Sequence, residues 1–318
     1  MMLLVVPCPA DEGISKTDLH ASIWACRQAI ATAWFEIERS LVEHGPDGSS
    51  LATNASYKIG ILGSMMLFEA NGDALIGHPG VSGVKDDIES GRLRIQRRRV
   101  LYAQTDTQTY LYLDRGAQLQ VGLPPDAAKR AVQFFDIRRL GLEVAPGPTA
   151  ISSGGVEITQ AAASSSDPRK VEMNYVCHKD ATKTSIVVDP TSFGVSRVEG
   201  MSADGRVRTV TEIENAVDTV SGIVFPTRVS IHDYVGGILS TETVLTVKKA
   251  SLNGPIDERQ FLPDQFHMAR DTVVVDMPSR RILGVWNGRM FVERPGIEVD
   301  SATMNAIYGR ATTSQPAH

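Results

Sequence analysis

The stretch from residue 222 to residue 252 reads GIVFPTRVSIHDYVGGILSTETVLTVKKASL. Two runs in it alternate between apolar and polar residues, and the pair Gly236-Gly237 stands between them. Such alternation predicts strands that bury one face. A Gly-Gly pair favours a two-residue turn because both of its positions can adopt a positive φ. Pro226 cannot donate to a strand ladder, so we expect it at a sheet edge or a bulge.

The same alternation extends over most of the chain, in about ten or more segments joined by short turns. Ala203-Asp204-Gly205 and Asn287-Gly288 predict two further hairpins. In the run from residue 56 to residue 73, we expect Gly63 at a bulge and Asn71-Gly72-Asp73 in a turn. Strands that follow one another in this way predict one large, strongly curved antiparallel sheet.

Helical patterns occur in two places. Ser15 and Asp18 form a capping-box pattern at the start of residues 15–32. Apolar residues then recur there at helical spacing, and a shorter helical insert spans residues 125–142. No helix alternates with the strands, which excludes a doubly wound sheet. We therefore predict an α+β fold in which the N-terminal helix and the insert cover the concave face.

Composition limits the classes of partner. The chain has 318 residues, 42% of them hydrophobic, and a net charge of −5, which argues against nucleic acid because phosphate binding needs a basic excess. No stretch approaches the length of a membrane span, so we expect a soluble monomer. Cys26 and Cys177 are either a disulfide or two buried thiols.

The N-terminus predicts export. A short apolar run in residues 1–10 ends in Cys8-Pro9-Ala10, which resembles the remnant of a signal peptide. A disordered apolar tip is the alternative. We expect a single domain over residues 11–300, a flexible tail over residues 301–318, and a location in the periplasm or cell envelope.

Several segments resemble the LolA/LolB/LppX-like superfamily, and in particular the diverged outer-membrane-lipoprotein-sorting-like proteins of planctomycete type. The resemblance lies in the order of elements and in short motifs. Val224 and Ala269-Arg270-Asp271 depart from it, because Trp and Gly are usual there. The segments are HASIWACRQAIATAWFEIE (20–38), FFDIRRLGL (134–142), SIVVDPTSFGVSRVEGMSADGRV (185–207), VSGIVFPTRVSIHDY (220–234) and DERQFLPDQFHMARDTVVVD (257–276).

The resemblance implies a half-barrel that carries a lipid or the acyl chain of a lipoprotein. The residues themselves indicate only a sheet with an apolar face, and we find no nucleophile elbow, P-loop or dinucleotide fingerprint. We therefore predict a non-catalytic transport protein with no cofactor and no metal. The alternative is a structural or protein-interaction module of the envelope with a filled core and no ligand.

The candidate site follows from the alternation of the strands. An apolar cavity would be lined by large side chains of the first strands, and arginines at its rim would suit an anionic head group. The predicted lining is Phe35, Ile37, Leu41, Ile59, Ile61, Met65, Leu93, Ile95, Leu101, Tyr110 and Tyr112, and the predicted head-group residues are Arg97 and Arg99.

Overall fold

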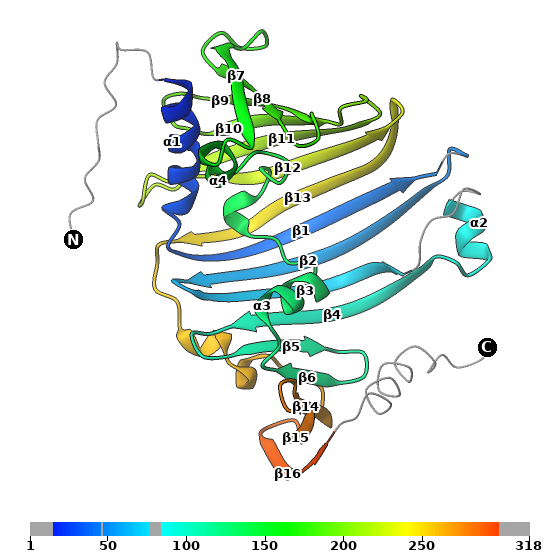
Figure 1. Ribbon diagram of the computed structural model, residues 1–318. Coiled ribbons are helices and arrows are strands. Elements are labelled where there is room, and N and C mark those ends of the chain that lie inside the picture. The colour runs from blue at the N-terminus through cyan, green and yellow to red at the C-terminus, as the bar shows by residue number, and fades with distance from the viewer. Residues whose placement is uncertain (1–14, 46, 77–83, 299–318) are drawn as a thin grey trace. The chain divides into compact units, whose positions relative to one another are not determined.

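A computed structural model describes residues 15–45, 47–76 and 84–298 (Figure 1). The predicted signal remnant and the predicted tail lie outside the described residues. The strands form a 16-stranded sheet in the order β16-β15-β14-β6-β5-β4-β3-β2-β1-β13-β12-β11-β10-β9-β8-β7. Since β16 and β7 stand at the two ends of this order, the sheet is open. This architecture confirms the predicted fold class, a large antiparallel sheet with an N-terminal helix.

The elements have the following bounds. The strands are β1 (Thr32–His44), β2 (Ser50–Leu62), β3 (Met65–Ile76), β4 (Arg94–Gln104), β5 (Thr109–Leu113), β6 (Gln118–Val121), β7 (Val156–Ala163), β8 (Val171–Cys177), β9 (Lys183–Val188), β10 (Val195–Met201), β11 (Val207–Val217), β12 (Val224–Val235), β13 (Ile238–Leu252), β14 (Thr272–Asp276), β15 (Arg281–Trp286) and β16 (Phe291–Glu298). The helices are α1 (Lys16–Gln28), α2 (Val84–Glu89), α3 (Pro125–Ala131) and α4 (Pro148–Ser152), with 3₁₀ turns η1 (Ile137–Arg139), η2 (Glu258–Phe261) and η3 (Pro263–Gln265).

Most neighbouring strands are sequential and antiparallel. This holds from β2 to β6, from β7 to β13 and from β14 to β16. β14 instead pairs with β6 in parallel, with Val273 beside Gln118. The sequence pattern did not predict this parallel pair, because alternation within a strand carries no information on the direction of its neighbour.

The local turn and bulge predictions on β12 are confirmed. Gly236 and Gly237 have φ values of +59° and +83°, and Val235 pairs with Ile238 across them. Pro226 lies opposite Asn215, where the register between β11 and β12 shifts. The bulge accommodates the missing donor of the proline within a central strand.

The predictions for β2 and β3 were wrong in detail. Leu62 pairs with Met65, so Gly63 lies in the hairpin turn, with a φ of +60°, and not at a bulge. Asn71-Gly72-Asp73 lies inside β3 and not in a turn. A Cβ on Gly72 would come within 2.4 Å of the Ala55 Cα. Gly72 therefore permits a close approach between β2 and β3. A glycine is favoured at such a contact as it is in a turn, so the sequence motif alone does not distinguish the two.

The chain divides into two compact units. Of the described residues, unit 1 comprises 15–30, Leu41–His44 and Arg138–Thr246. Unit 2 comprises Ala31–Ser40 and residues 45, 47–76, 84–137 and 247–298. In each unit, helices or loops of the same unit pack on the strands.

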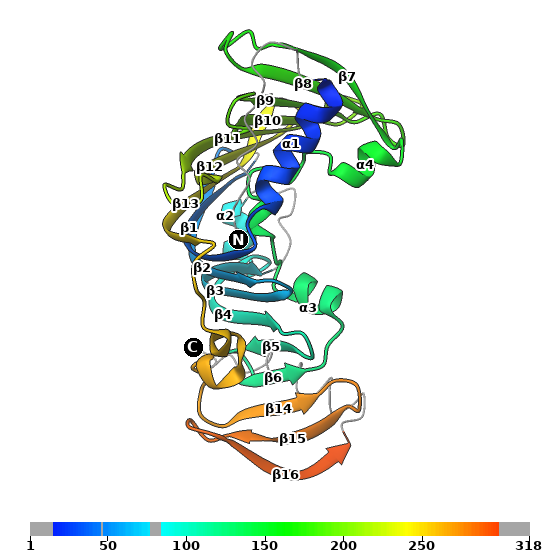
Figure 2. The same cartoon turned by 90° about the vertical axis from the view of Figure 1, so that its left-hand side faces the viewer.

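In unit 1, α1 covers the strands (Figure 2). The helix begins after Ser15, whose side chain accepts a hydrogen bond from the Asp18 amide at 3.1 Å, as the capping pattern predicted. The Trp24 indole donates to the Pro146 carbonyl at 3.0 Å and so joins α1 to the segment before α4. Gly141, with a φ of +77°, lies so close to Ile213 that a Cβ would be 2.6 Å from the Ile213 Cδ1. The apolar side of these strands is thus closely covered.

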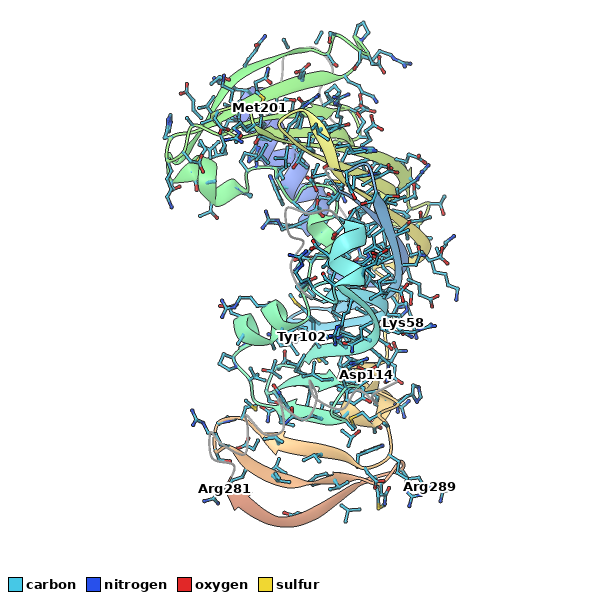
Figure 3. All side chains as sticks on the ribbon, turned by 90° about the vertical axis from the view of Figure 1, so that its right-hand side faces the viewer. Lys58, Tyr102, Asp114, Met201, Arg281 and Arg289 are labelled. Atoms are coloured by element: carbon cyan, nitrogen blue, oxygen red, sulfur yellow. The ribbon has the colours of Figure 1, made fainter. Side chains whose placement is uncertain are left out.

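In unit 2, both faces of the sheet are covered. Directly opposite residues of an antiparallel pair point to the same face, so the register defines two sets of side chains. The Phe68 face holds Tyr57, Ile59, Ile61, Phe68, Tyr102 and Leu111, and the Leu67 face holds Lys58, Gly60, Leu67, Glu69, Leu101, Ala103, Tyr110 and Tyr112. Figure 3 shows Lys58 and Tyr102 on opposite sides of the strands.

Candidate ligand-binding site

The residues predicted to line one cavity divide between the two faces of unit 2. Trp34 touches Gly60 of the Leu67 face, so the residues that alternate with it in β1 point to the Phe68 face. Leu93 lies in the turn before β4, and Leu41 belongs to unit 1. The Phe68 face therefore holds Phe35, Ile37, Ile59 and Ile61, and the Leu67 face holds Met65, Ile95, Arg97, Arg99, Leu101, Tyr110 and Tyr112.

Aromatic side chains fill the Phe68 face. The rings of Phe134 and Phe135 pack edge-on against Phe68, with centroids 5.6 Å apart in each case. Phe134 also meets Tyr102 at 5.7 Å, and Phe135 meets Tyr57 at 5.5 Å. Burial raises the pKa of Tyr102 to about 12. The segment after α3 thus occupies this face with its own side chains.

The Leu67 face lies under residues 254–268, here called the cover segment. Phe261 and Phe266 of this segment are buried in a cluster that includes Leu67, Leu101 and Tyr112. At its N-terminal end, the Asn253 side chain accepts hydrogen bonds from the Ala31 and Thr32 amides at 3.1 and 3.2 Å. After its C-terminal end, the Ala269 amide donates to the Tyr112 hydroxyl at 3.2 Å. The cover segment is therefore attached at both ends.

A pocket of about 220 Å³ lies between the Leu67 face and the cover segment. Its apolar lining comes from Trp34, Leu67, Leu101 and Phe266, and its polar lining from Lys58, Glu69, Gln260, Gln265 and His267. Of the residues predicted from the sequence, Leu101 lines this pocket. Trp34, Lys58 and His267 were missed, because they come from three segments that no local pattern connects.

Arg99 joins the sheet to the cover segment. Its Nε donates to Glu69 Oε1 at 2.6 Å, and its two terminal nitrogens donate to the carbonyls of Phe266 and His267 at 2.5 and 3.0 Å. Its guanidinium also stacks on Tyr112, at 5.5 Å from the ring centroid. His267 has a φ of +47°, which is uncommon for a residue with a side chain. The planar guanidinium fork thus holds a turn that is itself unfavourable.

Replacing Arg99 with methionine should loosen the cover segment. The variant removes three hydrogen bonds from a charged donor, each worth about 1.5–3 kcal/mol, and leaves Glu69 with only the 3.9 Å contact to Lys58. We expect amide exchange of residues 258–268 to accelerate by at least about tenfold, measured by hydrogen–deuterium exchange with mass spectrometry. Arg97 is the matched control, because it is exposed on the same face. Equal protection in R99M and R97M would contradict the role of Arg99.

Unit 1 carries a second, more polar depression. It has a volume of about 440 Å³ and is lined by side chains of β10–β13, including Arg197, Glu212, Arg228, His232 and Glu242. Among the described residues, no group of three or more His, Cys, Asp or Glu side chains could hold a metal ion. Cys26 and Cys177 are both free, as in the thiol alternative, but they are half-buried and not buried.

In the part of the chain that the structure describes, no helix combines the length and the apolar character needed to cross a membrane. No family model matches the chain. No curated protein matches it either.

Solved structures do show likenesses. A DUF1329 family protein from Desulfovibrio piger has a TM-score of 0.44 and 10% identity, over 78% of this chain and 96% of that chain. A LolA superfamily protein from Nitrosomonas europaea has a TM-score of 0.39 and 12% identity, over 78% and 99%. A lipoprotein-sorting protein domain from Vibrio parahaemolyticus, described as putative and outer-membrane, has a TM-score of 0.41 and 9% identity, over 77% and 95%. The names of the second and third of these structures are those of the groups that the sequence motifs resemble.

Proposed function

We propose that this protein binds and carries an apolar ligand, an acyl chain of a lipid or of an acylated protein, without catalysing a reaction. The observation that supports this most is the pocket on the Leu67 face. Three apolar side chains of the sheet, Trp34, Leu67 and Leu101, face Phe266 across a space of about 220 Å³. Concave, largely apolar spaces with a few polar groups at their rim are typical ligand sites.

Binding would rest on the burial of acyl surface, which contributes about 0.8 kcal/mol for each CH₂ group. The cover segment provides the route for release. It is short, it contains only the 3₁₀ turns η2 and η3, and it is attached at its ends through Asn253 and Arg99. Movement of residues 258–267 would open the pocket while the sheet beneath keeps its hydrogen bonds.

The proposed setting is the periplasm or cell envelope, where the protein would act as a soluble monomer on lipids or acylated proteins. An apolar ligand needs a carrier in an aqueous compartment because its transfer into water is unfavourable. The formal net charge of −5 suits a chain that remains dispersed in such a compartment.

Native mass spectrometry of the full chain, purified without detergent and then incubated with decanol, tests the proposal. We expect a one-to-one adduct with the parent protein. In the variant Gln260→Trp, an indole from the cover segment would occupy part of the pocket, and we expect the affinity to fall by at least about tenfold, or 1.4 kcal/mol.

The matched control is Glu258→Trp. Glu258 is exposed on the same 3₁₀ turn but does not line the pocket. This variant should bind decanol as the parent does. Equal affinity in the two variants would place the ligand elsewhere, and an absence of uptake by the parent would refute the carrier function.

A structural or protein-interaction module is the second candidate. The filled Phe68 face supports it, because Phe134 and Phe135 leave the aromatic side of unit 2 closed. A parent protein that takes up no lipid, and whose cover segment exchanges as slowly as the sheet, would favour this candidate.

A further inference from the structure

We propose that the pocket selects amphiphiles with one anionic head group, and that the ammonium of Lys58 holds that head. This inference rests on the proposed function and adds the class of ligand to it. It depends on three charged side chains of the Leu67 face, namely Lys58, Glu69 and Arg99.

The three charges do not cancel. Glu69 lies 2.6 Å from Arg99 through Oε1 and 3.9 Å from the Lys58 Nζ through Oε2. One carboxylate therefore faces two cations, which leaves a formal charge of +1 on this group of three side chains. The short contact belongs to Arg99, and 3.9 Å is the outer limit of an ion pair, so Glu69 satisfies Arg99 much more fully than it satisfies Lys58.

Arg99 is committed to the cover segment: three of its five N–H groups donate within the protein, its side chain is 20% exposed, and it does not line the pocket. All three of its guanidinium nitrogens donate to Glu69, Phe266 and His267. Lys58 differs from Arg99 in two respects: its side chain is 52% exposed, and the residue lines the pocket. An ammonium has three rotatable donors on a flexible stem, so Lys58 can turn from Glu69 toward an incoming anion without breaking a short contact.

The position of Lys58 matches the shape of an amphiphile. It lies directly opposite Glu69 on the neighbouring strand, one residue from Ile59, which points to the other face. Its stem therefore rises from the same surface as Leu67 and Leu101, on the side opposite Tyr102 (Figure 3), and its side chain is 52% exposed. A tail against the apolar lining and a head beside Lys58 would satisfy both parts of one molecule.

Four probes that each contain a ten-carbon chain test the inference in titrations followed by the tryptophan fluorescence of the full chain. They are decanoate, decyl phosphate, 1-decanol and decyltrimethylammonium. At about 20 mM salt, we expect the parent to bind an anionic probe about tenfold more tightly than decanol. The ratio should fall toward one at high salt, because the Debye length shortens to about 3 Å at 1 M. A preference for decanoate or for decyl phosphate distinguishes a fatty acid from a phospholipid-type head.

The variant Lys58→Gln should lose the preference and keep its affinity for decanol, whereas Lys58→Arg should retain the preference. Arg97→Gln is the matched control, because it removes an exposed cation from the same face that does not line the pocket. A ratio unchanged in K58Q, or equally reduced in R97Q, would overturn the inference and leave the carrier function intact. Equal binding of all four probes by the parent would do the same. If the parent binds none of the probes, the carrier function itself fails.

Discussion

Replacing Arg27 with methionine should raise the free energy of unfolding of unit 1 by about 3 kcal/mol. Arg27 lies near the C-terminal end of α1 with 3% of its surface exposed. Among the described residues, neither of its terminal nitrogens has a hydrogen-bond partner. Burial lowers the pKa of its guanidinium from 12.5 to about 10, and each pKa unit corresponds to about 1.4 kcal/mol. Methionine retains the apolar stem and removes a buried charge whose desolvation is only partly offset by its attraction to Cys26 and Glu143.

The pH dependence of this effect has a defined sign. The folded state holds the Arg27 proton less tightly than the unfolded state, so the destabilisation is fully present below pH 10 and is relieved as the pH rises through about 10. The gap between R27M and the parent should therefore be constant at neutral pH and narrow in strong alkali. Native-state hydrogen exchange of the slowest amides in β8–β12 measures it within unit 1.

Arg139→Met is the control for this prediction. Arg139 is exposed and stacks on Trp24 of the same helix, at 5.7 Å from the ring centroid. Its loss should lower the free energy of unfolding by no more than about 1 kcal/mol, the value of an exposed cation–π contact. If R27M instead destabilises unit 1, the buried charge of Arg27 contributes favourably, and the cost assigned to it is wrong.

Replacing Phe261 with alanine should lower the free energy of unfolding of unit 2 by about 3–5 kcal/mol, the usual cost of truncating a buried phenylalanine. Phe261 is fully buried in the cover segment. A Cβ on Gly60 would lie 3.3 Å from its ring and 3.0 Å from Trp34, so Phe261 and the pocket residue Trp34 pack on the same glycine. The variant should therefore also enlarge the space beside the pocket.

Hydrogen exchange of the slowest amides in β2–β4 measures the loss of stability. Leu262→Ala is the matched control, because Leu262 is the next residue in the chain and is 38% exposed. It should change the free energy of unfolding by less than about 1 kcal/mol. A similarly small effect of F261A would show that the cover segment contributes little to the stability of unit 2.

Local features of this fold could be predicted because neighbouring residues determine them. Ser15 caps α1 through the amide three residues later. Gly236 and Gly237 form the β12–β13 turn because both adopt positive φ. Pro226 has no amide proton, so within a central strand such as β12 it requires a bulge. Gly63 and Gly72 show the limit of such predictions. A glycine in the sequence is compatible with a turn, a bulge or a close contact between strands, and the sequence does not distinguish these three roles.

The sequence by itself determined that this chain forms a long series of two-faced strands, because a period of two is a property of each strand alone. Only the tertiary structure decided which faces share a surface, because a shift of one residue in register moves every side chain of a strand to the other face. Ile61 and Met65 are four residues apart, yet the turn at Gly63 places them on opposite faces. The pocket is likewise a product of the tertiary structure. It brings Trp34, Lys58 and His267 together only because the cover segment packs on the Leu67 face.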